Sequence, residues 1–267
     1  MKKIIIILYT TLFIFLLSHQ TNGHSIHLAN RLDQYDYISV ENNASVTSPF
    51  DSYVDFFNHL SNHVLKSAVM VFSIGNQPSR GSGVVFLEDD THYYALTNHH
   101  VIYKAPNETK YYRVQDYLGN IYDAEVIHLS PSYDLAVVKF LKTTMVFELI
   151  PFAKNNANVS EYVSIIGFPN TQVNAITMGE VTNYRVVEIS NTPSEIIDIT
   201  FSVMEMNAPV KGGSSGSLVV NQSYELIGIL YAATLVGSQT FFSFAIPIEK
   251  VIEFLELGSF EVGGEKA

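Results

Sequence analysis

The chain has 267 residues, with 26 acidic side chains against 15 basic ones, and it contains no cysteine. A net charge of −11 without a basic cluster argues against nucleic acid or anionic lipid as a partner, because both attract positive charge. Without cysteine the chain has to fold without disulfides, and it cannot carry a lipid on a cysteine.

The first residues have the pattern of a secretory signal peptide. Met1-Lys2-Lys3 precedes a 14-residue apolar run, Ile4 to Leu17, and a polar stretch follows that ends at Gly23. The run is shorter than the roughly 20 residues that span a bilayer, so 1–23 is predicted to be cleaved. A secreted or periplasmic location is therefore expected, with an uncleaved membrane anchor as the alternative.

Residues 24–49 are polar and aperiodic, which is typical of a flexible arm. A helix is predicted to start at Ser48-Pro49-Phe50-Asp51, because a serine cap, a proline at the first helical position and an acid three residues after the cap favour a helix start. Apolar residues then follow at helical spacing: Tyr53, Phe57, Leu60 and Val64.

The pattern then changes to a period of two, which indicates β-strands. The alternating runs fall into two sets of six, separated by a break at Pro151 to Asn158. This predicts an all-β protein of two six-stranded antiparallel β-barrels, barrel 1 at about 66–150 and barrel 2 at about 158–246, with short helices at both ends. The closing helix is expected at 247–257, with proline at its start and Gly258 after it. The runs lie near 68–74, 83–88, 92–97, 111–117, 121–128 and 134–141, and near 160–166, 175–189, 195–203, 216–221, 225–235 and 240–246.

Three short segments at the edges of these runs carry candidate catalytic residues. A histidine, an aspartate and a serine are the side chains that a serine hydrolase brings together. Asp134 follows His100 by 34 residues and Ser215 follows Asp134 by 81, which places the first two in barrel 1 and the serine in barrel 2. The segments are Thr97-Asn98-His99-His100-Val101, Tyr133-Asp134-Leu135-Ala136-Val137 and Gly213-Ser214-Ser215-Gly216-Ser217.

Each segment alone also has a plainer interpretation. The glycine-rich segment could be a flexible turn, and Asp134 could simply cap the strand that follows it. Neighbouring residues on a strand point to opposite faces, so at least one of His99 and His100 is expected to be an ordinary core or surface residue. A metal site would need both rings on one side and further ligands, so neither a metal nor a cofactor is expected.

Together the segments resemble those of chymotrypsin-fold serine proteases, most of all the HtrA/Deg type of exported protease. In that family the histidine lies in Thr-Asn-x-His-Val, which selects His100, and the aspartate lies in Asp-Leu-Ala-Val-x-Lys, matched by Asp134 to Lys139. The serine lies in Gly-Asn-Ser-Gly-Gly-Pro-Leu, matched by Gly213 to Leu218 with one residue missing. Further matches extend the resemblance over roughly 50–256: Ile166-Gly167-Phe168-Pro169, Gly179-Glu180-Val181, Leu226 to Ile229 and Phe244 to Pro247.

The resemblance implies a serine endopeptidase domain at 50–257 that acts on proteins or peptides through an acyl-enzyme. Ser215 would be the nucleophile, His100 the general base and Asp134 the residue that holds His100 in the correct tautomer. The backbone N–H groups of Gly213 and Ser215 would form the oxyanion hole. Ser215 is favoured over Ser214 because only Ser215 has a glycine two residues before it and another directly after it.

The serine loop departs from the family pattern. Lys211-Gly212 replaces Asn-Pro, and Ser217 alone replaces Gly-Pro, so that the loop is similar to that of glutamyl endopeptidases on the same fold. Glutamyl specificity is therefore one alternative. A catalytically silent trypsin-fold binding protein is another, and an esterase with the same site is a third.

Substrate preference is expected from residues near the serine. Pro209 lies six residues before Ser215, where trypsin-like enzymes carry an acid, and Leu230 follows Gly228-Ile229, where glutamyl endopeptidases carry a histidine. A pocket formed with Leu230, Tyr231 and Ala232 predicts cleavage after small or medium apolar residues. The resemblance further implies association of copies through 24–49, whereas the PDZ domain usual in HtrA proteases is not expected, because the chain stops ten residues after the closing helix.

Overall fold

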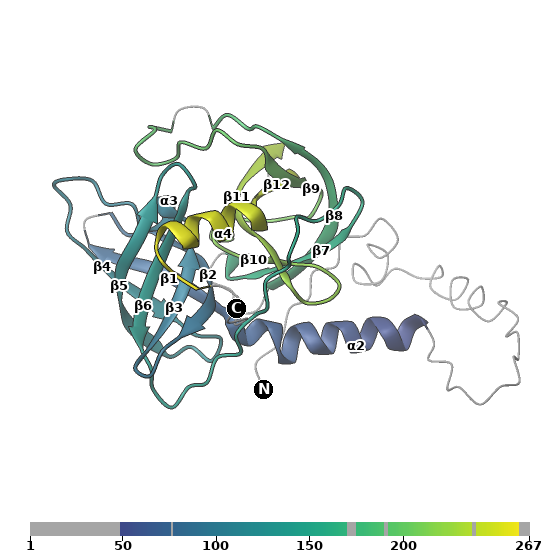
Figure 1. The fold of residues 1–267 in the computed structure, drawn as a ribbon, viewed down its shortest axis with the longest axis horizontal. Coiled ribbons are helices and arrows are strands. Elements are labelled where there is room, and N and C mark those ends of the chain that lie inside the picture. Colours follow the sequence, from purple (N-terminus) through teal and green to yellow (C-terminus); the bar gives the residue numbers. More distant parts are fainter. Residues whose placement is uncertain (1–48, 76, 170–174, 190–191, 237–238, 262–267) are drawn as a thin grey trace, which may run out of the picture.

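The structure, a computed structural model, describes residues 49–261 apart from residues 76, 170–174, 190–191 and 237–238. Two closed six-stranded barrels lie side by side, and every strand pair within them is antiparallel (Figure 1). This confirms the predicted fold class. The predicted signal peptide at 1–23, the Ser48 cap and all but the last residue of the arm at 24–49 lie outside the described residues.

Barrel 1 has the strand order β1-β2-β3-β6-β5-β4, and barrel 2 has the order β10-β11-β12-β9-β8-β7. Barrel 1 contains β1 (Ala68–Gly75), β2 (Arg80–Glu88), β3 (His92–Thr97), β4 (Lys110–Gln115), β5 (Ile121–Ser130) and β6 (Leu135–Leu141). Barrel 2 contains β7 (Tyr162–Gly167), β8 (Ala175–Arg185), β9 (Val203–Met206), β10 (Leu218–Val220), β11 (Leu226–Val236) and β12 (Gln239–Pro247). The helices are α2 (Pro49–Asn62), the 3₁₀ turn η1 (Val64–Ser67), α3 (His99–Ile102) and α4 (Ile248–Leu257).

One predicted strand was placed wrongly. Residues 195–203 do not form the ninth strand, which begins only at Val203, and the eighth strand ends at Arg185 instead of continuing to residue 189. The carbonyl oxygen of Pro193 accepts hydrogen bonds from the N–H groups of Ile196 and Ile197, at 2.9 and 3.2 Å. This local turn bends the chain where the apolar alternation had indicated an extended strand.

The alternation of side chains divides the interior into three apolar clusters. On β6, Ala136 and Val138 point into barrel 1, whereas Leu135 and Val137 point into a cluster between the barrels. The interior of barrel 2 forms the third cluster. The seam between the barrels is thus a packed core, and residues at its edge are held by both barrels.

The helices at the two ends of the described chain contact the barrels differently. Leu60 near the end of α2 is fully buried and Phe57 packs against the same core cluster, but Tyr53 near the start of the helix is 64% exposed, so the predicted apolar stripe packs from Phe57 onward. Helix α4 follows barrel 2 and returns to barrel 1, where Phe254 stacks on His128 with ring centroids 4.5 Å apart. Among the described residues, no helix has the length and apolar character needed to cross a membrane.

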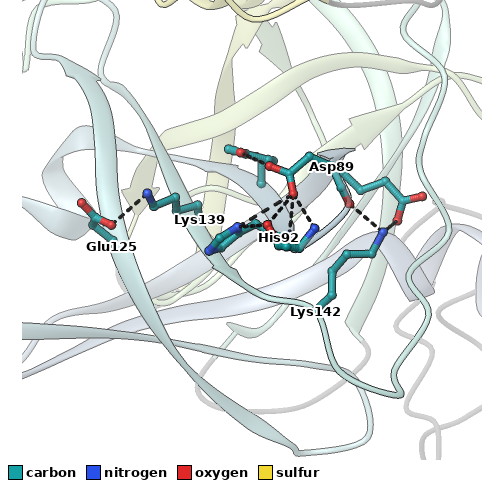
Figure 2. Close-up of polar contacts among 8 residues, drawn as sticks. Asp89, His92, Glu125, Lys139 and Lys142 are labelled. Carbon is teal, nitrogen blue, oxygen red and sulfur yellow. Dashed lines mark hydrogen bonds and ion pairs between the residues drawn. The ribbon is translucent and has the colours of Figure 1, made fainter.

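A polar network closes the β2–β3 hairpin of barrel 1 (Figure 2). One carboxylate oxygen of Asp89 accepts the backbone N–H groups of Thr91 and His92, each at 2.7 Å, and the other accepts the hydroxyl of Tyr94 at 2.6 Å. These hydrogen bonds, that of Tyr94 first, hold the pKa of Asp89 well below its ordinary value. Lys142 donates to the Asp89 carbonyl oxygen at 2.9 Å, which ties the hairpin to the chain after β6.

Candidate active site

His100 lies on α3, the short helix after β3. Its backbone N–H donates to Oδ1 of Asp134 at 2.9 Å, and its ring Nδ1 donates to Oδ2 of the same carboxylate at 2.7 Å. A carboxylate oxygen accepts this bond, so Nδ1 is the donor, and in the neutral imidazole the lone pair is then on Nε2. The side chain of His100 is 24% exposed and that of Asp134 is 0% exposed, so solvent reaches the pair only through the histidine.

Asp134 lies in the turn before β6 with a φ of +48°, in the left-handed region that aspartate tolerates better than most residues. Its N–H donates to the carbonyl oxygen of Pro131 at 3.2 Å, and its own carbonyl oxygen accepts a hydrogen bond from the amide of Asn98 at 2.9 Å. The backbone on both sides of Asp134 is thereby fixed, which holds its carboxylate against His100.

The segment around Ser215 consists of two consecutive tight turns. The N–H of Ser214 donates to the Lys211 carbonyl oxygen at 3.0 Å, and that of Ser217 donates to the Ser214 carbonyl oxygen at 2.9 Å. The third residue of each turn is a glycine with positive φ, +88° at Gly213 and +86° at Gly216, which is the signature of type II turns. The loop shortened by one residue therefore keeps an ordered conformation.

The turns leave two backbone donors of this loop unused. Among the described residues, the N–H groups of Gly213 and Ser215 donate no hydrogen bond, whereas those of Ser214, Gly216 and Ser217 all do.

The side chains of Ser214 and Ser215 also differ in exposure and contacts. Ser214 is buried and its Oγ accepts the N–H of Lys211 at 3.4 Å, while Ser215 is partly exposed.

Ser82 on β2 joins barrel 1 to the serine loop, and the motif analysis did not identify it. Its Oγ accepts the N–H of Phe168 and donates to the Gly213 carbonyl oxygen, each at 2.9 Å. Its own N–H donates to the carbonyl oxygen of Ser215 at 2.6 Å. The available signal was a serine between Gly81 and Gly83 on a strand, since glycines there indicate close approach of another backbone.

The residue after His100 and the backbone of Ser215 both lie close to Gly81 on β2. A Cβ added to Gly81 would lie 2.5 Å from a methyl group of Val101, the neighbour of His100, and 2.7 Å from the carbonyl oxygen of Ser215. The Oγ of Ser215 donates to the Tyr231 carbonyl oxygen at 3.5 Å, the outer limit for a hydrogen bond. Among the hydrogen bonds of the described residues, none joins Ser215 Oγ to His100.

The residues expected to bind substrate lie on β11 and on the segment before the serine loop. Tyr231 is 3% exposed and Leu230 is 2% exposed, with Leu230 in the interior cluster of barrel 2. Ala232 and Pro209 are partly exposed. Burial, followed by the charge of Asp134, raises the pKa of the Tyr231 hydroxyl. Its oxygen is buried without a hydrogen-bond partner among the described residues.

Other donor groups do not form a metal centre in this part of the molecule. Nδ1 of His99 donates to the Ile196 carbonyl oxygen at 2.8 Å, whereas Nδ1 of His100 donates to Asp134. The two histidines lie on a short helix and not on a strand as expected, but their rings still point to different partners. Within the described residues, no group of three or more histidine, aspartate or glutamate side chains is placed to hold a metal ion.

Two antiparallel six-stranded barrels, with a histidine–aspartate pair on one and a Gly-x-Ser-Gly loop on the other, define the class of chymotrypsin-like double-barrel proteins. A profile described as "Trypsin-like peptidase domain" matches residues 81–229. The chain belongs to this family.

Relatives of the chain are proteases of the HtrA type. It is 30% identical over 172 residues to a probable periplasmic serine endoprotease DegP-like of Buchnera aphidicola, covering 64% of this chain and 34% of the relative. It is 27% identical over 207 residues to a serine protease HtrA-like of Staphylococcus aureus, covering 74% of this chain and 26% of the relative. The chain thus spans about a third or less of the length of these curated relatives.

Solved structures confirm the fold. The HtrA-type protease AlgW with a tripeptide superimposes with a TM-score of 0.63 at 21% identity, covering 75% of this chain and 62% of that one. The active form of the Rv3671c protease from M. tuberculosis superimposes with a TM-score of 0.61 at 18% identity, covering 78% and 88%.

Proposed function

We propose that this chain is an exported serine endopeptidase that uses His100, Asp134 and Ser215. The observation that carries the proposal is the double hydrogen bond between His100 and the fully buried carboxylate of Asp134, at 2.9 and 2.7 Å. In the neutral imidazole this contact puts the lone pair on Nε2, the atom proposed to take the proton of Ser215. Membership of the trypsin-like peptidase family supports the assignment.

The reaction follows from these positions. Ser215 Oγ attacks the carbonyl carbon of the scissile peptide, and its proton passes to Nε2 of His100. Asp134 stabilises the resulting imidazolium. When the tetrahedral intermediate collapses, the C–N bond breaks and His100 gives the proton to the leaving amine. Water then hydrolyses the acyl-enzyme by the same route, with His100 again acting as base.

The unused N–H groups of Gly213 and Ser215 would bind the oxyanion of both intermediates. One such donor contributes about 3 kcal/mol to stabilisation of the transition state in comparable enzymes. Because Ser215 Oγ contacts the Tyr231 carbonyl oxygen at 3.5 Å, the hydroxyl must turn from that oxygen to His100 before attack. Catalytic hydrogen bonds are often long before substrate binds and shorten in the complex.

The substrate is proposed to be a protein or peptide cleaved after small or medium apolar residues. Partly exposed Pro209 and Ala232 would contact the side chain before the scissile bond, with Tyr231 and Leu230 forming the buried layer behind them. A cleavage profile of a peptide library dominated by glutamate would favour the glutamyl alternative instead. Export is supported by the sequence of residues 1–23 and by the word "periplasmic" in the name of one relative. Association through 24–49 stays a prediction.

The direct test is labelling of the purified protein with a fluorophosphonate probe at pH 7.5, beside Ser215→Ala and Ser214→Ala. Labelling that is lost in Ser215→Ala and kept in Ser214→Ala supports the proposal, because only an activated serine reacts. The long Ser215–Tyr231 contact favours one rival, a silent binding protein. Absence of labelling in the unmodified protein would support that rival, and labelling that depends on Ser214 would overturn the assignment of the nucleophile.

A further inference from the structure

Residues 193–201, which lie between β8 and β9 of barrel 2 and are called the clasp below, contact barrel 1 beside the candidate catalytic pair. Within the described residues, two hydrogen bonds and one ring contact join the clasp to His99, Pro131 and Tyr133. Each of these partners lies within three residues of His100 or Asp134 in the sequence.

The first contact is a hydrogen bond from a buried histidine. Nδ1 of His99 donates to the carbonyl oxygen of Ile196 at 2.8 Å. A backbone carbonyl only accepts, so the hydrogen must reside on Nδ1. His99 is 4% exposed, and its ring meets that of Tyr103 edge to face with centroids 5.8 Å apart. Both the position and the orientation of the donor are therefore fixed.

The other two contacts lie at the aspartate. The carbonyl oxygen of Pro131 accepts the N–H of Asp198 from the clasp at 2.9 Å, and it also accepts the N–H of Asp134 at 3.2 Å. The ring of Tyr133 packs on Phe201 of the clasp with centroids 5.8 Å apart. The same carbonyl group thus links the clasp to the backbone of the aspartate.

The clasp is continuous with the strands that position the serine. It leads directly into β9, which pairs with β12, and β12 pairs with β11. Tyr231 on β11 accepts the Ser215 hydroxyl through its carbonyl oxygen. The clasp is thus connected through paired strands of barrel 2 to the backbone that contacts Ser215, whereas His100 belongs to barrel 1.

We infer that His99 is a positioning residue, which through the clasp sets the approach of His100 to Ser215. This inference rests on the proposed function. His99 does not touch the reacting atoms, and its contribution comes from the hydrogen bond to Ile196, directly beside the residue that takes the proton. A displacement of about 1 Å at a reacting pair can cost on the order of 100-fold in rate.

Two substitutions at residue 99 separate the hydrogen bond from packing. His99→Phe keeps an aromatic ring against Tyr103 but has no donor. His99→Asn places an amide N–H where Nδ1 stands, so it can restore the bond to Ile196. A third variant, Tyr93→Phe, is the control for a general loss of stability. It removes another side-chain hydrogen bond to a carbonyl oxygen, from the Tyr93 hydroxyl to Met145 at 3.3 Å, near the start of β3, whereas His99 and His100 follow the end of that strand.

The first measurement is the saturation kinetics of fluorophosphonate labelling. His99→Phe is expected to lower the maximal labelling rate about 10- to 100-fold with little change in the half-saturating probe concentration, because reactivity and not probe binding depends on the positioning. His99→Asn should recover most of the rate, and Tyr93→Phe should label as the unmodified protein does. An equal loss in His99→Phe and Tyr93→Phe, or no recovery in His99→Asn, would overturn the inference.

The second measurement is hydrogen exchange of the clasp, which does not depend on activity. The Asp198 amide should exchange faster in His99→Phe and at its original rate in His99→Asn. If the Asp198 amide exchanges at the same rate in His99→Phe as in the unmodified protein, His99 does not hold the clasp. That result would overturn the inference even if the proposed function holds. If the unmodified protein does not label, the proposed function and the positioning role both fail, and the exchange data show separately whether His99 holds the clasp.

Discussion

Ser82 of barrel 1 donates its hydroxyl hydrogen to the carbonyl oxygen of Gly213 in barrel 2, at 2.9 Å. This bond fixes the peptide unit between Gly213 and Ser214, one residue before the candidate nucleophile. Because Ser82 is fully buried, water cannot replace the bond. The shape of the serine loop therefore depends on a residue more than 130 positions earlier in the chain.

Ser82→Ala is expected to lower both stability and labelling by the fluorophosphonate probe. The substitution leaves the Gly213 carbonyl oxygen and the Phe168 N–H without their partner, and a buried unsatisfied group costs about 1–3 kcal/mol. Urea unfolding measures the stability. Ser73→Ala is the control, because it removes a hydroxyl pair of barrel 1, Ser73 to Ser79 at 2.8 Å, away from the loop. Normal labelling of Ser82→Ala would contradict the role given to this bond.

Gly216→Ala is expected to abolish labelling. Its φ of +86° is unfavourable for any residue with a Cβ, and an added Cβ would lie 1.9 Å from the Ser82 carbonyl oxygen. Gly119→Ala is the matched control, because Gly119 has a φ of +94° in the turn between β4 and β5, away from the site. It should lose about 1–2 kcal/mol of unfolding free energy and keep its labelling rate. Equal labelling in both variants would refute the expectation.

Asp134→Asn is expected to lower the labelling rate by about 10⁴-fold without unfolding the protein. An asparagine amide can donate to Nδ1, which would move the hydrogen of His100 to Nε2 and remove the base. Asp116→Asn is the control, because Asp116 is a second fully buried carboxylate that accepts several hydrogen bonds in barrel 1. It should be less stable but should label at the normal rate. Measured circular dichroism spectra of the two variants establish whether they are folded.

Tyr231→Phe and Tyr184→Phe are expected to change stability in opposite directions. The Tyr231 hydroxyl is buried without a partner among the described residues, so removing it should stabilise the protein by about 1 kcal/mol. The Tyr184 hydroxyl donates to the Ala157 carbonyl oxygen at 2.7 Å, and removing it should destabilise by about 1 kcal/mol. Thermal unfolding measures both changes, and a loss of stability in Tyr231→Phe would show that its hydroxyl has a partner after all.

The Asp89 network predicts a dependence of stability on acid. The pKa of Asp89 is lowered in the folded protein, so its contribution is fully present above the ordinary carboxylate pKa of about 4 and is lost as the pH falls through the folded value. The difference in melting temperature between the unmodified protein and Asp89→Asn should therefore shrink below about pH 4. Tyr94→Phe, which removes the largest cause of the shift, should reduce this dependence. If the difference in melting temperature between the unmodified protein and Asp89→Asn stayed constant from pH 7 to pH 2, this role of Asp89 would be ruled out.

The barrels could be predicted from sequence because each strand has one face toward a barrel interior and the other toward the seam or solvent. That rule holds for Leu135 to Val138, where successive side chains enter different clusters. It failed at residues 195–203, because Ile199 and Phe201 pack against the cluster between the barrels from an irregular segment. Periodicity alone does not distinguish such a segment from a strand.

The candidate site was only partly predictable for a related reason. His100, Asp134 and Ser215 stand in local motifs, so adjacent residues were sufficient to select them as candidates. Ser82 and His99 act through carbonyl oxygens of Gly213 and Ile196, which are far from them in sequence. Every residue has the same backbone carbonyl group, whatever its side chain. The sequence therefore contains no motif that indicates which carbonyl oxygen accepts a given hydrogen bond.

The division of the site between the barrels has a consequence for biosynthesis. His100 and Asp134 are translated before Ser215, and the serine loop acquires its shape only when β10 to β12 have closed and Ser82 has met Gly213. A nascent chain that has not reached these strands therefore holds an incomplete candidate site. On the proposed function, the protein would acquire its hydrolytic activity only after the last strands are in place, without a separate inhibitor during synthesis.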